Sequence, residues 1–232
     1  MRVAVKYPSV FLAHAQRGDC VRQLAHDLSV QVVTILSVQA RASLLLPGGS
    51  SPQQLLPLLA AEPLEWARVD VSPTDERWVA ADAEQSNWRL LRQGLPAAAC
   101  LDPRQADSAQ ASATLWGDQL QGCMPFAAVL LGMGEDGHIA SLFPGMPGLA
   151  PALDLQAAPG ALCALAPSEP RQRLSLNLSM LLQTRWLGLL VFGQNKKQLI
   201  DAVLADAPQS RALPLHALLT VGRLPLRIYW AP

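Results

Sequence analysis

Apolar positions follow two different spacings along the chain, and the two spacings alternate from one end to the other. Apolar residues three and four apart, as at Val21, Leu24, Ala25 and Leu28, predict helices with one buried face. Short continuous apolar runs predict buried strands. Helices are predicted at 21–32 with Asp19 as cap, 52–60, 86–91, 107–116 and 199–204, and strands at 42–46, 66–71, 126–131, 161–166, 173–176, 186–192 and 226–230.

Strands that alternate with helices are typical of a parallel sheet with helices packed on it. The pattern therefore predicts an α/β protein with an open, mainly parallel sheet and helices on both faces. Proline and glycine gather near 144–151 and 159–170, and we interpret both stretches as long loops within one unit. We expect residues 1–232 to form a single domain.

Composition narrows the class of protein further. Half of the residues are apolar, 16% are charged and the formal net charge is zero, which argues against a general nucleic-acid or membrane-surface binder. No run reaches the roughly 20 apolar residues of a membrane-spanning helix. The four cysteines lack zinc-site spacing, so we expect reduced thiols and no metal. With no targeting signal at its start, the chain is expected in the cytoplasm.

The segment after the strand at 126–131 carries the densest chemistry. Its glycines permit positive φ and close backbone approach, and two carboxylates and an imidazole follow in the same turn. The glycine spacing formally matches a dinucleotide fingerprint, but the carboxylates would then face the pyrophosphate, so we reject that interpretation. Ligands of open α/β sheets bind where strands end, and this segment is a candidate site. Its candidate residues are Gly134, Glu135, Asp136, Gly137 and His138.

A second glycine-containing loop joins the strand at 42–46 to the helix at 52–60. Gly48, Gly49 and Ser50 precede Ser51, a natural helix cap, and Pro52, which is favoured at the first helical position. Free backbone N–H groups at such a helix start can bind phosphate. A tight turn without a ligand is the equal alternative. No lysine follows as in a nucleoside-triphosphate-binding loop.

Charged residues at other element junctions are the third group. Asp75 and Arg77 follow the strand at 66–71, Arg173 begins a strand, and Lys196 stands where a helix begins. A lysine at a helix start gains nothing from the helix dipole, so an anionic ligand there would explain it. For each residue, ordinary solvent exposure is the alternative. The loops after parallel strands meet at one edge of a sheet, and this favours a shared site.

Together these motifs, in this order, resemble those of the 6-phosphogluconolactonases, and the likeness extends from about residue 43 to the C-terminus. The resemblance implies a Rossmann-like, NagB/RpiA-type sheet and hydrolysis of 6-phospho-D-glucono-1,5-lactone in the oxidative pentose phosphate pathway, with no cofactor. Related glucosamine-6-phosphate deaminases continue differently where this chain has Ser141. The motifs are Gly48–Pro52, Asp75–Arg77, Ser86–Asn87, Gly132–Gly145 and Arg173–Leu176.

Lactone hydrolysis needs an activated water and stabilisation of a developing oxyanion. His138 is the candidate base, because histidine ordinarily titrates near neutral pH. The resemblance gives Asp75 the role of orienting the imidazole. Glu135 and Asp136 are expected to fix the loop or contact sugar hydroxyls.

The predicted phosphate clamp combines three cations with the amides of the glycine loop at 48–50. Its cations are Arg77, Arg173 and Lys196, since guanidinium binds two phosphate oxygens and ammonium acts as a point charge. The expected partner is a phosphorylated sugar lactone, bound by a monomer or weak homo-oligomer. An amino-sugar-phosphate deaminase or isomerase and a non-catalytic sugar-phosphate sensor remain the alternatives.

Overall fold

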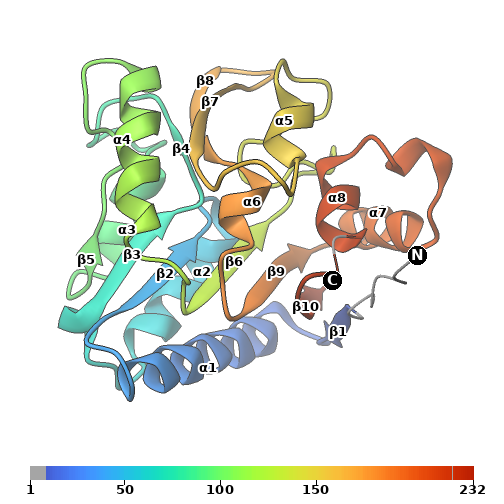
Figure 1. Cartoon of the computed structure of the whole chain (residues 1–232). Coiled ribbons are helices and arrows are strands. Elements are labelled where there is room, and N and C mark those ends of the chain that lie inside the picture. Colours follow the sequence, from blue (N-terminus) through green and yellow to red (C-terminus); the bar gives the residue numbers. More distant parts are fainter. Residues whose placement is uncertain (1–8, 221) are drawn as a thin grey trace.

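Seven parallel strands form the central layer of the structure, a computed structural model that describes residues 9–220 and 222–232 (Figure 1). Neighbouring strands follow the order β1-β10-β9-β6-β2-β3-β5, and every pair is parallel. The predicted open, mainly parallel sheet is confirmed. Its strands are β1 (Val10–Ala13), β2 (Ala42–Leu46), β3 (Val69–Pro73), β5 (Ala99–Cys100), β6 (Ala128–Gly132), β9 (Leu187–Phe192) and β10 (Leu226–Ala231).

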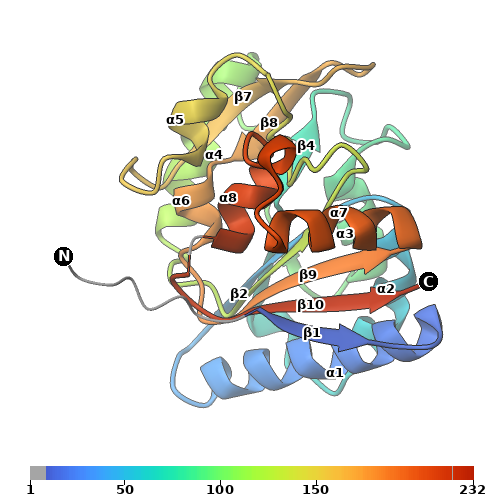
Figure 2. The same cartoon turned by 90° about the vertical axis from the view of Figure 1, so that its right-hand side faces the viewer.

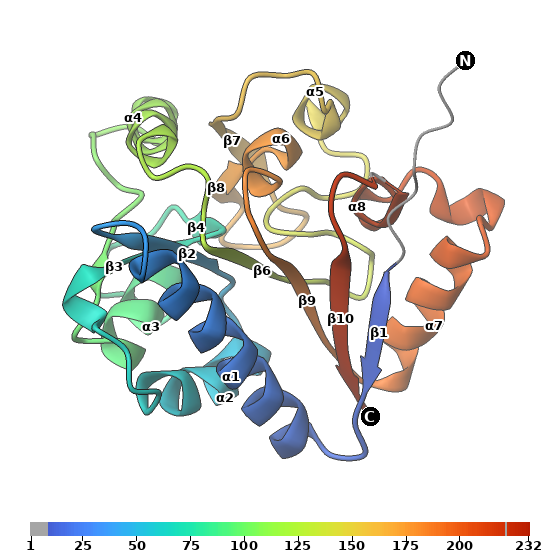
Figure 3. The same ribbon diagram turned by 60° about the horizontal axis from the view of Figure 1, so that its bottom comes forward.

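Helices cover both faces of this sheet, as predicted. Side chains alternate between the faces of a strand, so Leu44 and Leu46 of β2 pack into one core and Leu45 into the other. In Figure 2 α1 lies below the strands and α7 and α8 lie above them, and Figure 3 shows α2 beside α1. The helices are α1 (Arg17–Leu36), α2 (Ser50–Ala60), α3 (Asn87–Gly94), α4 (Ala109–Gln121), α5 (Leu149–Leu153), α6 (Leu178–Leu181), α7 (Gln194–Leu204) and α8 (Pro214–Thr220).

A small antiparallel sheet lies outside the main one. Its strand order is β4 (Asp75–Arg77), β8 (Gln172–Leu176) and β7 (Ala161–Leu165). Strands at 161–166 and 173–176 were predicted, but the segment 75–77 was expected to be a loop. The apolar pattern identifies strands without identifying their partners, and β4 is too short and too charged to show a pattern.

Several predicted element boundaries differ from those of the structure, and three of the differences have a clear local cause. The first helix begins at Arg17, so Asp19 lies in its first turn and is not the cap. Helix α2 is capped by Gly49, two residues before the expected Ser51, and its φ of 98° suits glycine. Trp66–Arg68 forms a 3-10 turn before β3, and the predicted strand is shorter by these residues.

The carboxyl ends of β9, β6, β2 and β3 are adjacent because these strands are neighbours in a parallel sheet. The segments that follow them begin at Gly193, Met133, Pro47 and Thr74, so residues far apart in sequence meet at one edge. Within the part of the chain that the structure describes, no helix is long and apolar enough to span a bilayer.

Candidate active site

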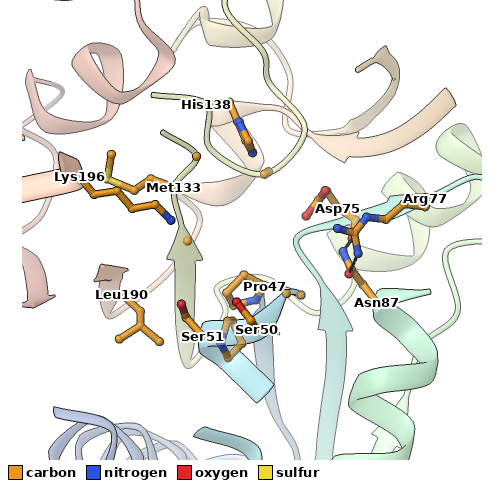
Figure 4. Close-up of a pocket in the computed structure, with 16 residues that line it drawn as sticks. Pro47, Ser50, Ser51, Asp75, Arg77, Asn87, Met133, His138, Leu190 and Lys196 are labelled. Carbon is orange, nitrogen blue, oxygen red and sulfur yellow. Dashed lines mark hydrogen bonds between the residues drawn. The ribbon is translucent and has the colours of Figure 1, made fainter. Parts of the chain in front are cut away.

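A cavity of about 250 Å³ lies at the carboxyl edge of the sheet (Figure 4). Its wall is built from the segments after β2, β3, β6 and β9, which is where the sequence predicted a shared site. Eight of the twelve predicted site residues line it: Gly48, Gly49, Ser50, Asp75, Arg77, Gly134, His138 and Lys196. The other lining residues are Pro47, Ser51, Pro52, Asn87, Gly132, Met133, Ala140 and Leu190.

The glycine loop between β2 and α2 leaves its backbone open to the cavity. A Cβ at Gly48 would stand 1.7 Å from Oδ1 of Asn87, so only glycine allows Asn87 its position. Gly49 has a positive φ, with no atom within 4 Å of a Cβ placed there. The first N–H groups of α2 follow at once, and such groups are free to bind an anion.

Arg77 is held at the cavity by two acceptors. Its Nη1 donates to the side-chain oxygen of Asn87 and to the carbonyl of Gln85 at 3.0 Å. Asn87 in turn donates from Nδ2 to the carbonyl of Asp75 at 2.7 Å. Figure 4 shows the Arg77 guanidinium against Asn87 with Asp75 beside it. The guanidinium therefore has a fixed place and keeps N–H groups for a ligand.

The segment after β6 forms a tight loop that presents His138. Gly134 N donates to the His138 carbonyl at 3.0 Å, and Gly137, with a φ of 80°, makes the turn between them. A Cβ at Gly134 would stand 2.2 Å from imidazole atoms Cε1 and Nδ1. The ring also packs on Phe143, with 4.5 Å between centroids. These contacts fix the imidazole while 30% of the side chain stays accessible.

The partner of the imidazole differs from the expected one. Nδ1 of His138 lies 2.6 Å from Oδ1 of Asp136, while Asp75 accepts a hydrogen bond from the Ser141 hydroxyl at 2.5 Å. Asp136 is two residues away in the same loop and reaches the ring directly. Ser141 also donates its N–H to Ser175 Oγ at 3.1 Å, which ties the loop to β8. Asp136, not Asp75, therefore contacts Nδ1 of His138, and a role of Asp75 in orienting the imidazole stays a prediction.

The carboxyl of Asp136 is affected by its environment in two opposite ways. Partial burial raises its pKa, but hydrogen bonds from His138 and the charge of that ring lower it more. The net pKa lies below the ordinary value for aspartate. Asp136 is thus ionised at neutral pH and engages Nδ1 of His138, so Nε2 is the ring nitrogen that this carboxylate does not contact.

Lys196 enters the cavity from the first turn of α7. In Figure 4 its side chain extends toward the cavity from the side opposite Arg77, past Met133. The structure gives it no ion pair within residues 9–220 and 222–232, whereas the next residue, Lys197, pairs with Asp201 at 2.7 Å. A lysine without an internal partner at a helix start is suited to an anionic ligand.

Four predicted site residues do not line the cavity. Glu135 and Asp136 are solvent-exposed on the loop, and Gly137 packs against Leu213 of the opposite segment. Arg173 is buried and pairs in register with Arg77 across β4 and β8. Burial lowers the pKa of its guanidinium, and Arg77 lowers it further. Asp136 contacts the site only through His138, and Arg173 lies beside Arg77 in the small sheet.

Sequence reasoning missed some of the cavity. The motif at Ser86–Asn87 was identified, but no role was predicted for Asn87. Its contact with Arg77 depends on where the antiparallel pairing places β4. Met133 and Leu190 form an apolar part of the wall, and nothing in a buried strand marks such residues as ligand contacts. Ser141 was noted only as a difference from the deaminases.

Comparison with known proteins agrees with this geometry. The chain matches the family described as glucosamine-6-phosphate isomerases/6-phosphogluconolactonase over residues 15–226. It is 38% identical to a 6-phosphogluconolactonase of Pseudomonas putida over 98% of this chain and 96% of that protein. It is also 38% identical to the Pseudomonas aeruginosa 6-phosphogluconolactonase, covering 93% and 92%.

Solved structures show the same fold. A 6-phosphogluconolactonase from Shewanella baltica superimposes with a TM-score of 0.89 at 30% identity, over 99% of this chain and all of that chain. A monomeric glucosamine-6-phosphate deaminase has a TM-score of 0.76 at 16% identity, over 96% and 97%, and shares the fold alone. On the extent of the family match and the identity to its members, the chain belongs to the glucosamine-6-phosphate isomerase/6-phosphogluconolactonase family.

Proposed function

We propose that this protein hydrolyses 6-phospho-D-glucono-1,5-lactone to 6-phospho-D-gluconate in the oxidative pentose phosphate pathway. The observation that carries the proposal is one cavity with an oriented imidazole in one part of its wall and cations with free helix amides in the others. A phosphorylated lactone has a matching pair of groups, an activated ester carbonyl and a dianion. Relatives at 38% identity that bear the name 6-phosphogluconolactonase support it.

In the proposed mechanism Nε2 of His138 takes a proton from a water as the water oxygen attacks the lactone carbonyl. The carbonyl π electrons move to its oxygen, and the tetrahedral intermediate collapses by breaking the bond to the ring oxygen. That oxygen leaves as a hydroxyl after receiving the proton from the imidazolium. Asp136 stabilises the charge that His138 carries in between, and the imidazole ends neutral.

The other end of the substrate binds by charge. Arg77 offers planar N–H donors to two phosphate oxygens, Lys196 adds a point charge, and the amides of Gly48–Ser50 complete the clamp. Arg173, buried beside Arg77 on the neighbouring strand, contributes further positive charge. Asp75, held by Ser141, is placed to accept a hydrogen bond from a sugar hydroxyl.

We also propose the domain organisation, location, oligomeric state and lack of a cofactor that the sequence indicates. They are a single domain over residues 1–232, action in the cytoplasm as a monomer or weak homo-oligomer, and no resident metal or cofactor. Size-exclusion chromatography with light scattering over a range of protein concentrations tests the oligomeric state.

The function is tested with freshly generated 6-phosphogluconolactone, coupling the released 6-phosphogluconate to its oxidation. The lactone opens spontaneously, so the rate in buffer is subtracted. Acceleration that saturates with substrate is expected. Binding without acceleration would favour the sensor, and ammonia release from glucosamine 6-phosphate would favour the deaminase; either would contradict the proposal.

Replacing Asp136 with asparagine is expected to lower kcat about 10-fold with little change in KM, because a carboxamide keeps the hydrogen bond to Nδ1 but not the charge. Glu135→Asn, at the adjacent exposed carboxylate, is the matched control and should retain wild-type kcat. Equal kcat in Asp136→Asn and wild type would contradict the role.

The same variant tests a pH dependence of stability. The pKa of Asp136 is lower in the folded chain, so its stabilisation is complete above the unfolded value of about 3.9 and disappears as pH falls through the folded pKa. The carboxylate is nearly half exposed, so this contribution is below about 1 kcal/mol. Urea unfolding at pH 7 and pH 3 should show a smaller pH difference in Asp136→Asn.

A further inference from the structure

The carboxylate of Glu76 lies behind the cavity wall and is the acceptor at the centre of a buried network. The residue is fully buried and does not line the cavity. Its Oε1 accepts from the backbone N–H of Arg77 and from that of Asn87, each at 2.8 Å. One oxygen thus holds the backbone of both residues whose side chains meet at the cavity.

The second oxygen of Glu76 has three further partners. Oε2 accepts from Ser86 Oγ at 2.9 Å and from the Trp88 N–H at 2.8 Å, and lies 3.0 Å from Nη1 of Arg104. Ser86 caps α3, so the carboxylate meets the start of this helix, where backbone N–H groups lack internal partners. The buried charge is balanced by Arg104, which is itself mostly buried.

The network reaches the ligand cavity through Asn87. The Glu76 carboxylate fixes the backbone of Asn87, and the Asn87 side chain accepts from Arg77 Nη1 and donates to the Asp75 carbonyl. Gly48 leaves room for that amide, because any Cβ there would overlap it. The Arg77 guanidinium drawn in Figure 4 is thus connected, through Asn87, to a carboxylate that does not line the cavity.

We propose that Glu76 is the positioning residue of the phosphate clamp: its carboxylate sets the place of Arg77 through the first turn of α3 and Asn87. The inference rests on the proposed function for the identity of the anion. A carboxylate is required because both oxygens must accept. Glutamine would turn an N–H₂ group toward at least two of these donors and leave them unpaired in a buried place.

The test is a double-mutant cycle of Glu76→Gln and Arg77→Ala, with kcat and KM for 6-phosphogluconolactone and the Kd of 6-phosphogluconate by calorimetry. With Arg77 present, Glu76→Gln should raise KM and Kd about 10-fold and leave kcat within about twofold. In the Arg77→Ala background, Glu76→Gln should raise KM and Kd by less than a further factor of about two, because the effect of Glu76 passes through Arg77.

Asp102→Asn is the matched control. Asp102 is the second carboxylate that pairs with Arg104, with 2.9 Å between Oδ1 and Nη2, and in the contacts that the structure describes it touches neither Arg77 nor α3. The KM of the Asp102→Asn variant should therefore stay at the wild-type value. Equal effects of Glu76→Gln in both backgrounds, or a loss of kcat without a change in KM, would overturn the proposal.

A second variant, Ser86→Ala, and the Kd of 6-phosphogluconate distinguish a wrong role for Glu76 from misfolding of Glu76→Gln and from a wrong proposed function. If Glu76→Gln does not fold, Ser86→Ala is used in its place, because it removes one donor to the carboxylate. We then expect KM and Kd to rise about threefold, and we expect no rise in the Arg77→Ala background. An unchanged Kd in Ser86→Ala would then overturn it. If the wild type binds 6-phosphogluconate but does not hydrolyse the lactone, the proposed function fails and the Kd cycle still decides the role of Glu76.

Discussion

Replacing His138 with alanine is expected to lower kcat for 6-phosphogluconolactone by about 10²–10⁴-fold, the contribution usual for a positioned general base. The reason is geometric. Asp136 engages Nδ1 at 2.6 Å, so Nε2 is the nitrogen left to accept a proton from water at the cavity. The measurement is the coupled assay after subtraction of spontaneous hydrolysis.

The affinity for 6-phosphogluconate should stay within about threefold in His138→Ala, because the charge that binds phosphate is on other elements. His216→Ala is the matched control: this imidazole lies 3.3 Å from an Asp206 oxygen, outside the cavity, and its loss should leave kcat unchanged. A His138→Ala enzyme with wild-type kcat would show that water attack needs no base from this residue.

The parts of the fold that follow from local pattern could be predicted. The buried strand at 42–46 and the strand at 186–192 are continuous apolar runs, and both were found with boundaries within one residue of β2 and β9. The antiparallel pairing of β4 with β8 joins residues about 100 positions apart, and no local pattern reports such a pairing. The small sheet was therefore not foreseen.

The site divides in the same way. His138 and the glycine loop were predicted because their residue types are unusual after a buried strand. The partner of His138 was not, because the choice between Asp75 and Asp136 depends on the turn made by Gly134 and Gly137. Glu76 was missed for a further reason: its proposed role comes from four hydrogen-bond donors and the Arg104 guanidinium, which folding brings together.

Replacing Arg77 with alanine is expected to raise KM for 6-phosphogluconolactone and Kd for 6-phosphogluconate about 10–100-fold, the usual effect of losing hydrogen bonds between charged groups. The Asn87 side chain and the Gln85 carbonyl hold the Arg77 guanidinium in place. We expect no other arginine to replace it in the variant. Arg173 lies closest in register, but it is buried and donates from Nε to the Pro170 carbonyl at 2.8 Å.

Unphosphorylated glucono-1,5-lactone separates a phosphate contact from a general defect. Its kcat/KM should change less than about threefold in Arg77→Ala, since this substrate lacks the dianion that the guanidinium binds. Arg92→Ala is the control for overall charge: Arg92 is an exposed α3 residue that stacks over Trp88, 5.1 Å from the ring centroid, outside the cavity. Its KM should match the wild type. An equal loss of kcat/KM for the two lactones in Arg77→Ala would show that Arg77 does not bind the phosphate and instead maintains the shape of the site.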